Sequence, residues 1–376
     1  MVQKKRKISI LGAGNVGATI AYALTLQGVA SEIVLVDINK EKAEGEALDI
    51  AQCAACVPAC KIWSGEYSDV AGSDIVIITF GVGRKPGQTR LDLAAINIGI
   101  LKSVIKDVAL IAPEALYVVV SNPVDVLTYV VMKDTGLSKN QVIGTGTLLD
   151  SNRLQQAVAD YCKVDASNVT AYVFGEHGDA CMVPWSLCTV CGMNIRDYCT
   201  KIMGVNKEDL EAELDNIYKG MVAAGSKVIK AKGATFYAIA ASTVQLVKAL
   251  IADTETILPL ATYLDGEYGA KNLCTGVLCK VGGTGFKQIV EVPLPEDEMK
   301  LFSEKLASLD LWGYYIEDRL IGVIGTRDEV SHISLFFVDN EFQRHSFGKK
   351  LLETMNRSSD RQKLWGEGAP IESEEI

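Results

Sequence analysis

A single histidine, His177, lies in the first 309 residues of the chain, in the stretch VFGEHGDACMVP. Histidine titrates near neutral pH, so it is well suited to exchange the proton in a reaction that moves a hydride and a proton together. Glycines on both sides of this histidine let the backbone come close to a ligand. A lone histidine is more often structural than catalytic, so its role depends on the residues that the fold places beside it.

A glycine-rich turn near the N-terminus has the spacing GxGxxG, in the sequence GAGNVG. It follows an apolar run, opens a helical pattern and is followed 20 residues later by an aspartate that ends a second apolar run. Such a turn brings a helix N-terminus to a pyrophosphate, and the aspartate accepts hydrogen bonds from ribose hydroxyls. A carboxylate there repels a 2′-phosphate, so NAD is favoured over NADP. The candidate cofactor residues are Gly12, Gly14, Asn15, Val16, Gly17 and Asp37.

Short apolar runs alternate with helical patterns over residues 1–147. This alternation predicts an α/β fold of the Rossmann type, with a doubly wound parallel sheet and helices on both faces. We expect this part to be the NAD-binding domain. The expected strands are residues 7–14, 31–38, 73–81, 115–123 and 140–147, and the expected helices are residues 15–28, 40–54 and 91–113.

The pattern changes after residue 147. Residues 148–309 mix helices and strands without regular alternation, which predicts an α+β catalytic domain. The expected helices are 150–162, 207–233, 235–253 and 295–309, and the expected strands are 168–175, 257–269 and 286–294. Residues 310–357 form a further small α/β fragment with two or three strands and a helix. Residues 358–376 are polar and acidic, so we expect a flexible tail.

Charge and hydropathy exclude two broad classes of function. The net charge of −10 argues against a nucleic-acid partner, which would need a basic face, although a small anionic ligand remains compatible. The start MVQKKRK and the apolar run after it resemble a secretory signal, but the glycine-rich turn interrupts that run. No other segment is long and apolar enough to span a membrane, so we expect no membrane partner.

The chain contains ten cysteines, including two CxxC pairs formed by Cys53 with Cys56 and by Cys188 with Cys191. Paired cysteines can bind zinc or form a disulfide. Both pairs lie in apolar segments, where cysteine acts as a small buried hydrophobic residue, so we favour free thiols and no metal. Free thiols without a targeting signal indicate the reducing cytoplasm.

Five motifs of the first 309 residues occur together in one known family. They are GAGNVG, RKPGQTRLDL, VSNPVDVLT, GTGTLLDSNR and FGEHGDA, in this order. On these motifs, residues 5 to about 309 resemble the NAD-dependent L-lactate and malate dehydrogenases. The resemblance implies a small 2-oxo or 2-hydroxy acid substrate and a homo-oligomer, either a tetramer or a dimer.

The resemblance assigns catalytic roles to His177 and Asp150 and a substrate-binding role to Arg153. His177 resembles the proton donor and acceptor at the reacting oxygen. Asp150 resembles the carboxylate that hydrogen-bonds this histidine and stabilises its charged form. Arg153, on the same helix face as Asp150, resembles the residue that binds the substrate carboxylate at two points.

Three further residues receive roles from the same resemblance. Arg90 resembles the arginine that polarises the reacting carbonyl, as negative charge grows there. Asn122 resembles the residue that orients the substrate oxygen and the nicotinamide end of the cofactor. Thr235 resembles a residue of the small-substrate pocket. Residues 80–93, FGVGRKPGQTRLDL, resemble the mobile loop that closes over the substrate and brings Arg90 to it.

Substrate choice depends on Arg84, the residue before Lys-Pro-Gly, which faces the distal end of the substrate in this family. Lactate dehydrogenases usually have glutamine there, whereas malate dehydrogenases have arginine, which can bind a second carboxylate. A guanidinium over the methyl group of pyruvate would be desolvated and unpaired. The sequences TRLDL and GTGTLLDS, Glu176 and Thr235 are nevertheless lactate-like. We therefore expect an L-lactate dehydrogenase of pyruvate fermentation, with malate dehydrogenase as the alternative and another 2-hydroxy acid after it.

Two positions concern regulation by a sugar bisphosphate. Many bacterial lactate dehydrogenases bind fructose 1,6-bisphosphate through an arginine and a histidine. Here these positions hold Gln155 and Thr170, neither of which is charged. We therefore expect no activation by this compound.

The extra C-terminal piece, residues 313–355, resembles the central part of a GNAT acetyltransferase. That family binds acetyl-CoA with a Gln-x-x-Gly-x-Gly loop at a helix N-terminus. The corresponding loop here is QRHSFG, residues 343–348, with Ser346 in place of a glycine. Only about 50 residues match, too few for a full domain with its own core. The segment could be a non-catalytic remnant, a module that binds CoA or a protein, or an active transferase.

Overall fold

The structure is a computed structural model of the chain. It describes residues 6–82, 90–307, 310–316, 319–327, 332–338, 346–347 and 350. It also leaves out the side chains of residues 90–93, 95, 307 and the three strands that follow. Arg84, the side chain of Arg90 and most of the loop at residues 343–348 therefore lie outside the described residues.

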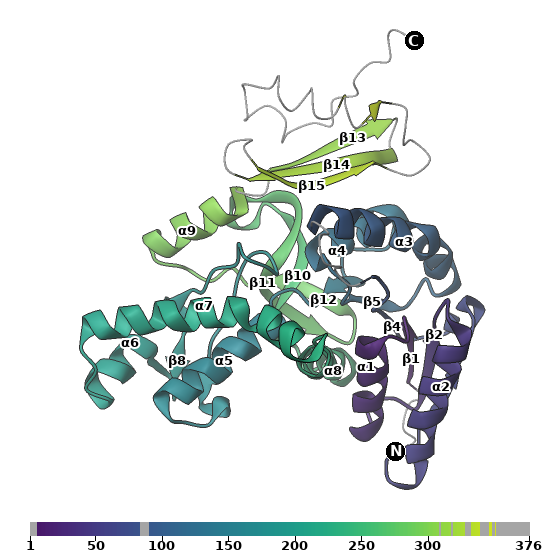
Figure 1. The fold of residues 1–376 in the computed structure, drawn as a ribbon, viewed down its shortest axis with the longest axis horizontal. Helices are drawn as coiled ribbons and strands as arrows, with labels where there is room; N and C mark the ends of the chain where they lie inside the picture. Colours follow the sequence, from purple (N-terminus) through teal and green to yellow (C-terminus); the bar gives the residue numbers. More distant parts are fainter. Residues whose placement is uncertain are drawn as a thin grey trace.

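A nine-stranded sheet runs through the middle of the molecule, in the order β12-β11-β10-β6-β5-β4-β1-β2-β3 (Figure 1). Six neighbouring strands are parallel, which confirms the predicted doubly wound sheet. The apolar side chains of these strands are buried on both faces, as in other parallel sheets, except in the edge strand β3, where they are half-buried. These strands are β1 (Lys7–Leu11), β2 (Glu32–Val36), β3 (Lys61–Ser64), β4 (Ile75–Ile78), β5 (Leu116–Val119) and β6 (Val142–Gly144). The short edge strand β3 was not expected from the sequence.

Three of the four helices that cover these strands begin where the sequence predicted them to within a few residues, and the fourth, α4, was not predicted. Helix α1 carries the glycine-rich turn at its N-terminus, and α4 begins directly after the SNP sequence. These helices are α1 (Asn15–Leu26), α2 (Lys40–Ala51), α3 (Arg90–Ile111) and α4 (Val124–Thr135).

Three antiparallel strands extend the same sheet beyond β6, so both halves of the chain contribute strands to one continuous sheet. The junction is the pair Ala261 and Gly144, where a Cβ atom on the glycine would lie 2.9 Å from that of the alanine. The strands are β10 (Thr256–Asp265), β11 (Lys271–Gly282) and β12 (Gly285–Ile289). The sequence did not predict β11, the longest of them.

The expected strand at residues 168–175 was mostly wrong. Only β7 (Val169–Thr170) is a strand there, and it pairs in a small sheet with β8 (Thr189–Val190) and β9 (Met193–Asn194). The rest of that segment pairs with the backbone of β11 and with its own continuation. This irregular path carries His177.

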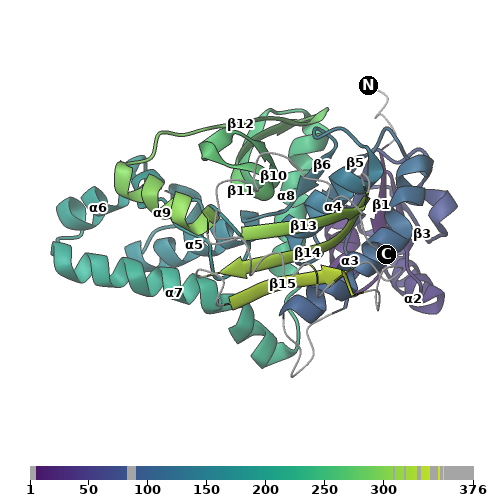
Figure 2. The same cartoon turned by 90° about the horizontal axis from the view of Figure 1, so that it is seen from above.

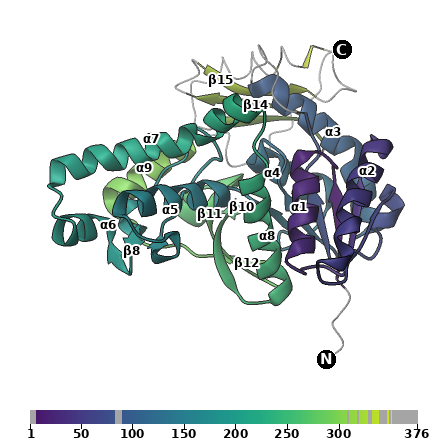
Figure 3. The same ribbon diagram turned by 60° about the horizontal axis from the view of Figure 1, so that its bottom comes forward.

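Three helices of the second half enclose a separate apolar cluster, and the other two pack into the core of the nine-stranded sheet. Helix α7 lies alongside α5, and α8 packs against α1, as Figure 3 shows. These elements are α5 (Leu148–Cys162), the short α6 (Ile195–Asp197), α7 (Lys207–Lys232), α8 (Tyr237–Ala252) and α9 (Glu296–Ala307). In the part of the chain that the structure describes, no helix combines the length and hydropathy needed to cross a membrane.

All ten cysteines are free thiols. Six are buried, and burial raises the pKa of the Cys188 thiol to about 12. Cys56 and Cys191 are exposed and Cys53 is half-buried, so the prediction that both CxxC pairs are buried holds for Cys188 alone. Each of the two exposed residues lies at a turn beyond the end of its element, where no second layer of structure covers it.

Three strands follow α9 and form a separate antiparallel sheet, in the order β13-β14-β15. They are β13 (Asp310–Ile316), β14 (Arg319–Arg327) and β15 (His332–Val338), and they confirm the strands predicted for this segment. Strand β15 runs along α3, and Figure 2 shows the small sheet lying across that helix. The helix expected at residues 347–357 falls largely outside the described residues.

Candidate active site

The turn between β1 and α1 has the close backbone approaches that its glycines allow. Gly12 has φ +107°, and a Cβ atom on it would lie 2.7 Å from the backbone nitrogen of Phe80. A Cβ atom on Gly17 would lie 1.9 Å from the carbonyl oxygen of Gly12. A Cβ atom on Gly14 would meet no protein atom within 4 Å. Two of the glycines therefore permit packing, while Gly14 faces open space at the helix N-terminus, where a pyrophosphate would fit.

Asp37 follows β2 beside this turn and is half-buried. Its Oδ2 accepts a hydrogen bond from the main chain of Ala13 at 2.7 Å, and its Oδ1 accepts one from Asn39 at 2.8 Å. The carboxylate therefore holds the glycine-rich turn to the end of the next strand. Asn15 is exposed and Val16 is half-buried at the same place. The predicted cofactor residues therefore lie together at the carboxyl ends of β1 and β2.

The loop that carries His177 is a tight turn closed by two backbone bridges. Phe174 and Met182 exchange two hydrogen bonds of 2.8 and 2.9 Å. Gly175, with φ +92°, exchanges two of 2.9 Å with Gly276 of β11. The histidine therefore projects from a short loop whose base is fixed to the central sheet.

Helix α5 brings Asp150 against this loop. Its neighbour Ser151 accepts a hydrogen bond from the main chain of Val173, and Thr147 donates one to the carbonyl of Val173. Both contacts fix the helix to the segment just before the histidine. The Oδ2 atom of Asp150 lies 2.6 Å from Nδ1 of His177.

This contact acts on the pKa of the imidazole. Burial acts to lower the pKa of His177, but the charge and hydrogen bond of Asp150, together with the charge of Asp125, outweigh it. The pKa of His177 is therefore raised above its usual value. The Nδ1 atom of the ring is taken up by Asp150, which leaves Nε2 as the ring nitrogen that can exchange a proton with a ligand.

Arg153 lies one turn further along α5. Its Nη1 atom is 3.1 Å from Oδ1 of Asp150, so one carboxylate contacts both the histidine and the arginine. Helix α7 passes beside the guanidinium at Gly225, where a Cβ atom would lie 3.8 Å from Nη2. About a fifth of the arginine side chain is exposed. The site thus places an ionisable imidazole close to a cation that can bind a carboxylate.

Sequence reasoning missed one carboxyl group of this site, Asp125 in the first turn of α4. Its Oδ2 accepts a hydrogen bond of 3.0 Å from the main-chain N–H of His177. Burial raises the pKa of Asp125 to about 7. The residue lies within the motif VSNPVDVLT, and an acidic residue two positions after a proline, in the first turn of a helix, was the available signal.

Asn97 of α3 was also missed. Its side chain is buried and donates to the carbonyl oxygen of Asn122 at 2.8 Å, while it accepts from the main chain of Val82 at 2.9 Å. It therefore ties the start of the loop after β4 to the segment before α4. Asn122 itself is exposed, and its peptide bond to Pro123 is cis.

The remaining predicted residues are only partly placed. Thr235 is half-buried in the connection between α7 and α8. Arg90 is the first residue of α3, but its side chain lies outside the described residues, as does all of Arg84. The structure therefore brings together His177, Asp150 and Arg153, and the positions of the two loop arginines remain predictions.

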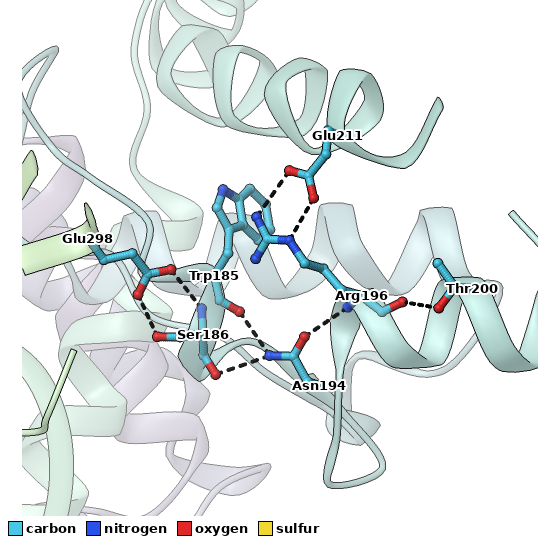
Figure 4. A network of polar contacts seen from close by, with 7 residues as sticks. All are labelled: Trp185, Ser186, Asn194, Arg196, Thr200, Glu211 and Glu298. Atoms are coloured by element: carbon cyan, nitrogen blue, oxygen red, sulfur yellow. Dashed lines mark hydrogen bonds and ion pairs between the residues drawn. The ribbon is translucent and has the colours of Figure 1, made fainter. Parts of the chain in front are cut away.

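A polar network supports the segment after the histidine loop, as Figure 4 shows. The side chain of Glu298 on α9 accepts hydrogen bonds from the main chain and the hydroxyl of Ser186. Asn194 donates to the carbonyls of Trp185 and Ser186, at 3.2 and 3.1 Å. Arg196 makes a two-point ion pair with Glu211 of α7. The network therefore connects α7 and α9 to the loop end that leads back from His177.

Two family models match almost the whole described core. The model described as the lactate/malate dehydrogenase NAD binding domain matches residues 6–144. The model described as the lactate/malate dehydrogenase alpha/beta C-terminal domain matches residues 147–310. A third, described as the acetyltransferase (GNAT) domain, matches residues 280–365. The last two matches overlap, and the overlap includes β12 and α9, which pack in this structure with the nine-stranded sheet and its core.

The chain is similar to curated proteins over the same region. An L-lactate dehydrogenase of Clostridium botulinum (strain Langeland) is 46% identical over 304 residues, which cover 79% of this chain and 93% of that protein. The protein called L-lactate dehydrogenase 1 of Clostridium acetobutylicum is 42% identical over 308 residues, covering 82% and 97%.

Solved structures agree with this similarity. The minor L-lactate dehydrogenase from Enterococcus mundtii, in its ligands-bound form, superposes with a TM-score of 0.77 at 39% identity. A lactate dehydrogenase enzyme from a Medee basin deep-sea metagenome library superposes with a TM-score of 0.76 at 36% identity. Each match covers 81% of this chain and 96% of the other.

Proposed function

The chain belongs to the lactate/malate dehydrogenase family, and from this we propose that it is an NAD-dependent L-lactate dehydrogenase, which transfers a hydride reversibly between NADH and pyruvate. The observation that carries this proposal is the arrangement of His177 and Arg153 on the same carboxylate, that of Asp150. A proton donor and a carboxylate-binding cation in contact with one acid suit a small 2-oxo acid.

We assign the proton to His177. In pyruvate reduction NADH supplies the hydride, and Nε2 of the protonated imidazole gives its proton to the carbonyl oxygen. Asp150 stabilises the positive charge before that transfer and fixes the tautomer afterwards, because its Oδ2 lies 2.6 Å from Nδ1. In the reverse direction the neutral imidazole takes the proton from the hydroxyl of lactate.

We propose that the substrate is held by residues on both sides of this pair. Arg153 binds the substrate carboxylate, and Arg90 polarises the carbonyl as negative charge develops on its oxygen. Asn122 orients the substrate oxygen and the nicotinamide, and Thr235 lines the pocket for the small side chain. The glycine-rich turn and Asp37 bind the pyrophosphate and adenosine ribose of NAD, with Gly14 facing the phosphates.

The second candidate is malate dehydrogenase, and the observation in its favour is Arg84 in the sequence RKPGQTR. An arginine at the distal end of the substrate would pair with the second carboxylate of oxaloacetate. The relatives named above are all called lactate dehydrogenases, which supports pyruvate.

Initial rates of NADH oxidation with pyruvate and with oxaloacetate test the proposal. We expect kcat/KM for pyruvate to exceed that for oxaloacetate at least about tenfold, which corresponds to about 1.4 kcal/mol in the transition state. A preference for oxaloacetate would replace the proposed substrate while leaving the enzyme class unchanged.

We further propose a cytoplasmic homotetramer or dimer that acts at the end of glycolysis in pyruvate fermentation. The free thiols support a reducing compartment, and the exposed apolar residues Leu26 and Leu48 on α1 and α2 support association with further subunits. Sedimentation equilibrium of the full chain tests the assembly, and a monomer would contradict it.

For the C-terminal segment, we propose a non-catalytic GNAT remnant that is docked on the dehydrogenase. The packing of β15 along α3 supports docking, and the short length of the match supports loss of activity. A module that binds CoA or a protein is the alternative of another class. Calorimetric titration of acetyl-CoA into the full chain and into a chain ending at Leu309 distinguishes them. Heat of binding in the full chain alone would favour the module.

A further inference from the structure

Two carboxyl groups from different helices contact His177 at different points. Asp150 of α5 contacts the ring at Nδ1, and Asp125 of α4 accepts the main-chain N–H. The first contact belongs to the catalytic arrangement proposed above. The second contact is made to the main chain. It therefore fixes the position of the histidine backbone and does not select the tautomer of the ring.

Asp125 lies in surroundings that make this backbone contact strong. Its Oδ1 atom is inaccessible and has no hydrogen-bond partner among the described residues, so the contact with His177 is its one hydrogen bond there. A hydrogen bond to an acidic group in a site of low polarity is stronger than one at the surface. Truncation of this side chain would leave the N–H of His177 unsatisfied.

Asp125 also links two parts of the site along the chain. It stands three residues after Asn122, whose carbonyl oxygen is held by Asn97 of α3. Helix α4 begins between them, at Val124. The first turn of α4 therefore connects the segment proposed to face the nicotinamide with the main chain of His177.

We infer that Asp125 is a positioning residue of the proton-transfer site: its carboxyl group anchors the backbone of His177 to the first turn of α4 and so sets the imidazole at a fixed distance from the nicotinamide side of the pocket. This inference rests on the proposed dehydrogenase function. Asp125 does not touch the substrate, and it acts only through the histidine.

Asp125 should also affect the titration of His177, and several ionisable groups lie around it. Glu176 and His177 face it from the loop, Asp150 faces it from α5, and Cys274 faces it from β11. The charge of Asp125 raises the pKa of His177, so its removal acts to lower that pKa.

The test compares Asp125→Asn and Asp125→Ala in the full chain. Asparagine keeps an oxygen that can accept the N–H of His177 but removes the charge, whereas alanine removes both. Asp134→Asn is the matched control, because Asp134 is a carboxylate of the same helix that pairs with Lys102 of α3 at 3.7 Å. Asp150→Asn is the positive control for the proposed function. The readouts are kcat, KM for pyruvate and NADH, and the pH dependence of kcat/KM. Each is measured on samples in which the same fraction of the protein is folded.

We expect Asp125→Ala to lower kcat at least about tenfold, while KM for NADH stays within about twofold. Asp125→Asn should recover most of kcat but lose activity at a lower pH than the wild type. Asp134→Asn should match the wild type in both respects. Equal kcat and an unshifted pH profile in both Asp125 variants would overturn the inference. If the alanine variant does not fold, an unshifted profile in Asp125→Asn overturns it alone. Full activity in Asp150→Asn would instead refute the proposed function.

Discussion

The imidazole of His177 and the carboxylate of Asp150 are in direct contact, with 2.6 Å between Nδ1 and Oδ2. They come from a loop and a helix that are 27 residues apart in the chain. The carboxylate is largely buried, so its charge acts on the ring through little solvent. The contact therefore raises the pKa of His177 against the effect of burial.

Replacing Asp150 with asparagine should separate proton transfer from cofactor binding. The neutral amide cannot stabilise the imidazolium ion, and it allows the wrong tautomer. We expect kcat/KM for pyruvate to fall about 10²- to 10⁴-fold. Stopped-flow or steady-state NADH oxidation measures this change, and NADH fluorescence should show the affinity of the cofactor unchanged.

The pH dependence of pyruvate reduction is a second test of the contact between His177 and Asp150. The reaction in this direction needs protonated His177, so kcat/KM should fall as pH rises through the raised pKa of the histidine. In Asp150→Asn the midpoint of this fall should move to lower pH. A midpoint that stays in place would show that another group controls the profile.

The glycine-rich turn offers a matched pair of substitutions, Gly14→Ala and Gly17→Ala. A Cβ atom at Gly17 would lie 1.9 Å from a backbone oxygen, so this variant should lose about 1–3 kcal/mol of stability. A Cβ atom at Gly14 meets nothing in the protein, so its variant should unfold like the wild type. Gly14→Ala should nevertheless bind NADH at least about tenfold more weakly, because the methyl group stands where the pyrophosphate approaches.

Thermal unfolding and NADH titration of both variants test this pair. An equal loss of stability in the two would contradict the packing argument. Unchanged affinity for NADH in Gly14→Ala would show that the cofactor does not approach the turn closely.

The parallel half of the sheet and the placement of Asp150 and Arg153 on one helix could be predicted because their signals are local. Buried parallel strands appear as continuous apolar runs, and the spacing of Asp150 and Arg153 places them on one helix face. Strand β11 was missed because its sequence, KNLCTGVLCKVG, alternates weakly and contains glycines. It is a strand because β10 and β12 pair with it on both sides.

Asp125 could not be predicted as a partner of His177 for a different reason. The contact is made to a main-chain N–H, and every residue other than proline has that group. No residue type or spacing in the histidine loop marks it. The same holds for Asn97, which contacts the main chain of Val82 and Asn122. Such contacts depend on how α3 and α4 are placed on the sheet.

The stability of the protein should depend on pH through Asp125. The folded pKa of Asp125 is about 7 and lies above its ordinary value of 3.8. Its contribution to the free energy of unfolding is therefore fully present below pH 3.8 and is lost as pH rises through about 7. His177 acts in the same direction, since its folded pKa is also raised. Between pH 5.5 and 8.5, wild type should therefore lose about 2 kcal/mol relative to Asp125→Asn.

Urea unfolding of both proteins at the two pH values measures this difference. The comparison with Asp125→Asn removes contributions that all other groups make equally to both chains. A difference in the free energy of unfolding that does not change with pH would show that Asp125 is ionised throughout.

Substrate choice should respond to Arg84→Gln. If the arginine pairs with the second carboxylate of oxaloacetate, its loss should lower kcat/KM for oxaloacetate about 10- to 100-fold relative to pyruvate. Lys85→Gln is the matched control, because it removes the neighbouring positive charge. An equal change in both variants would indicate a general charge effect in the loop and not a specific pair.

The network around Ser186 predicts a stability effect that is separate from catalysis. Both carboxylate oxygens of Glu298 accept hydrogen bonds from Ser186, one from its main chain and one from its hydroxyl. Glutamine keeps one acceptor but presents an amide N–H₂ group to the other donor. The free energy of unfolding should therefore fall by about 1–2 kcal/mol in Glu298→Gln. Glu304→Gln, on the exposed side of the same helix, should change it by less than about 0.5 kcal/mol.

Because Glu298 lies beyond the backbone bridges that fix the histidine loop, kcat per folded molecule should stay within about twofold of wild type. A large loss of kcat at unchanged stability would show instead that α9 controls the position of His177.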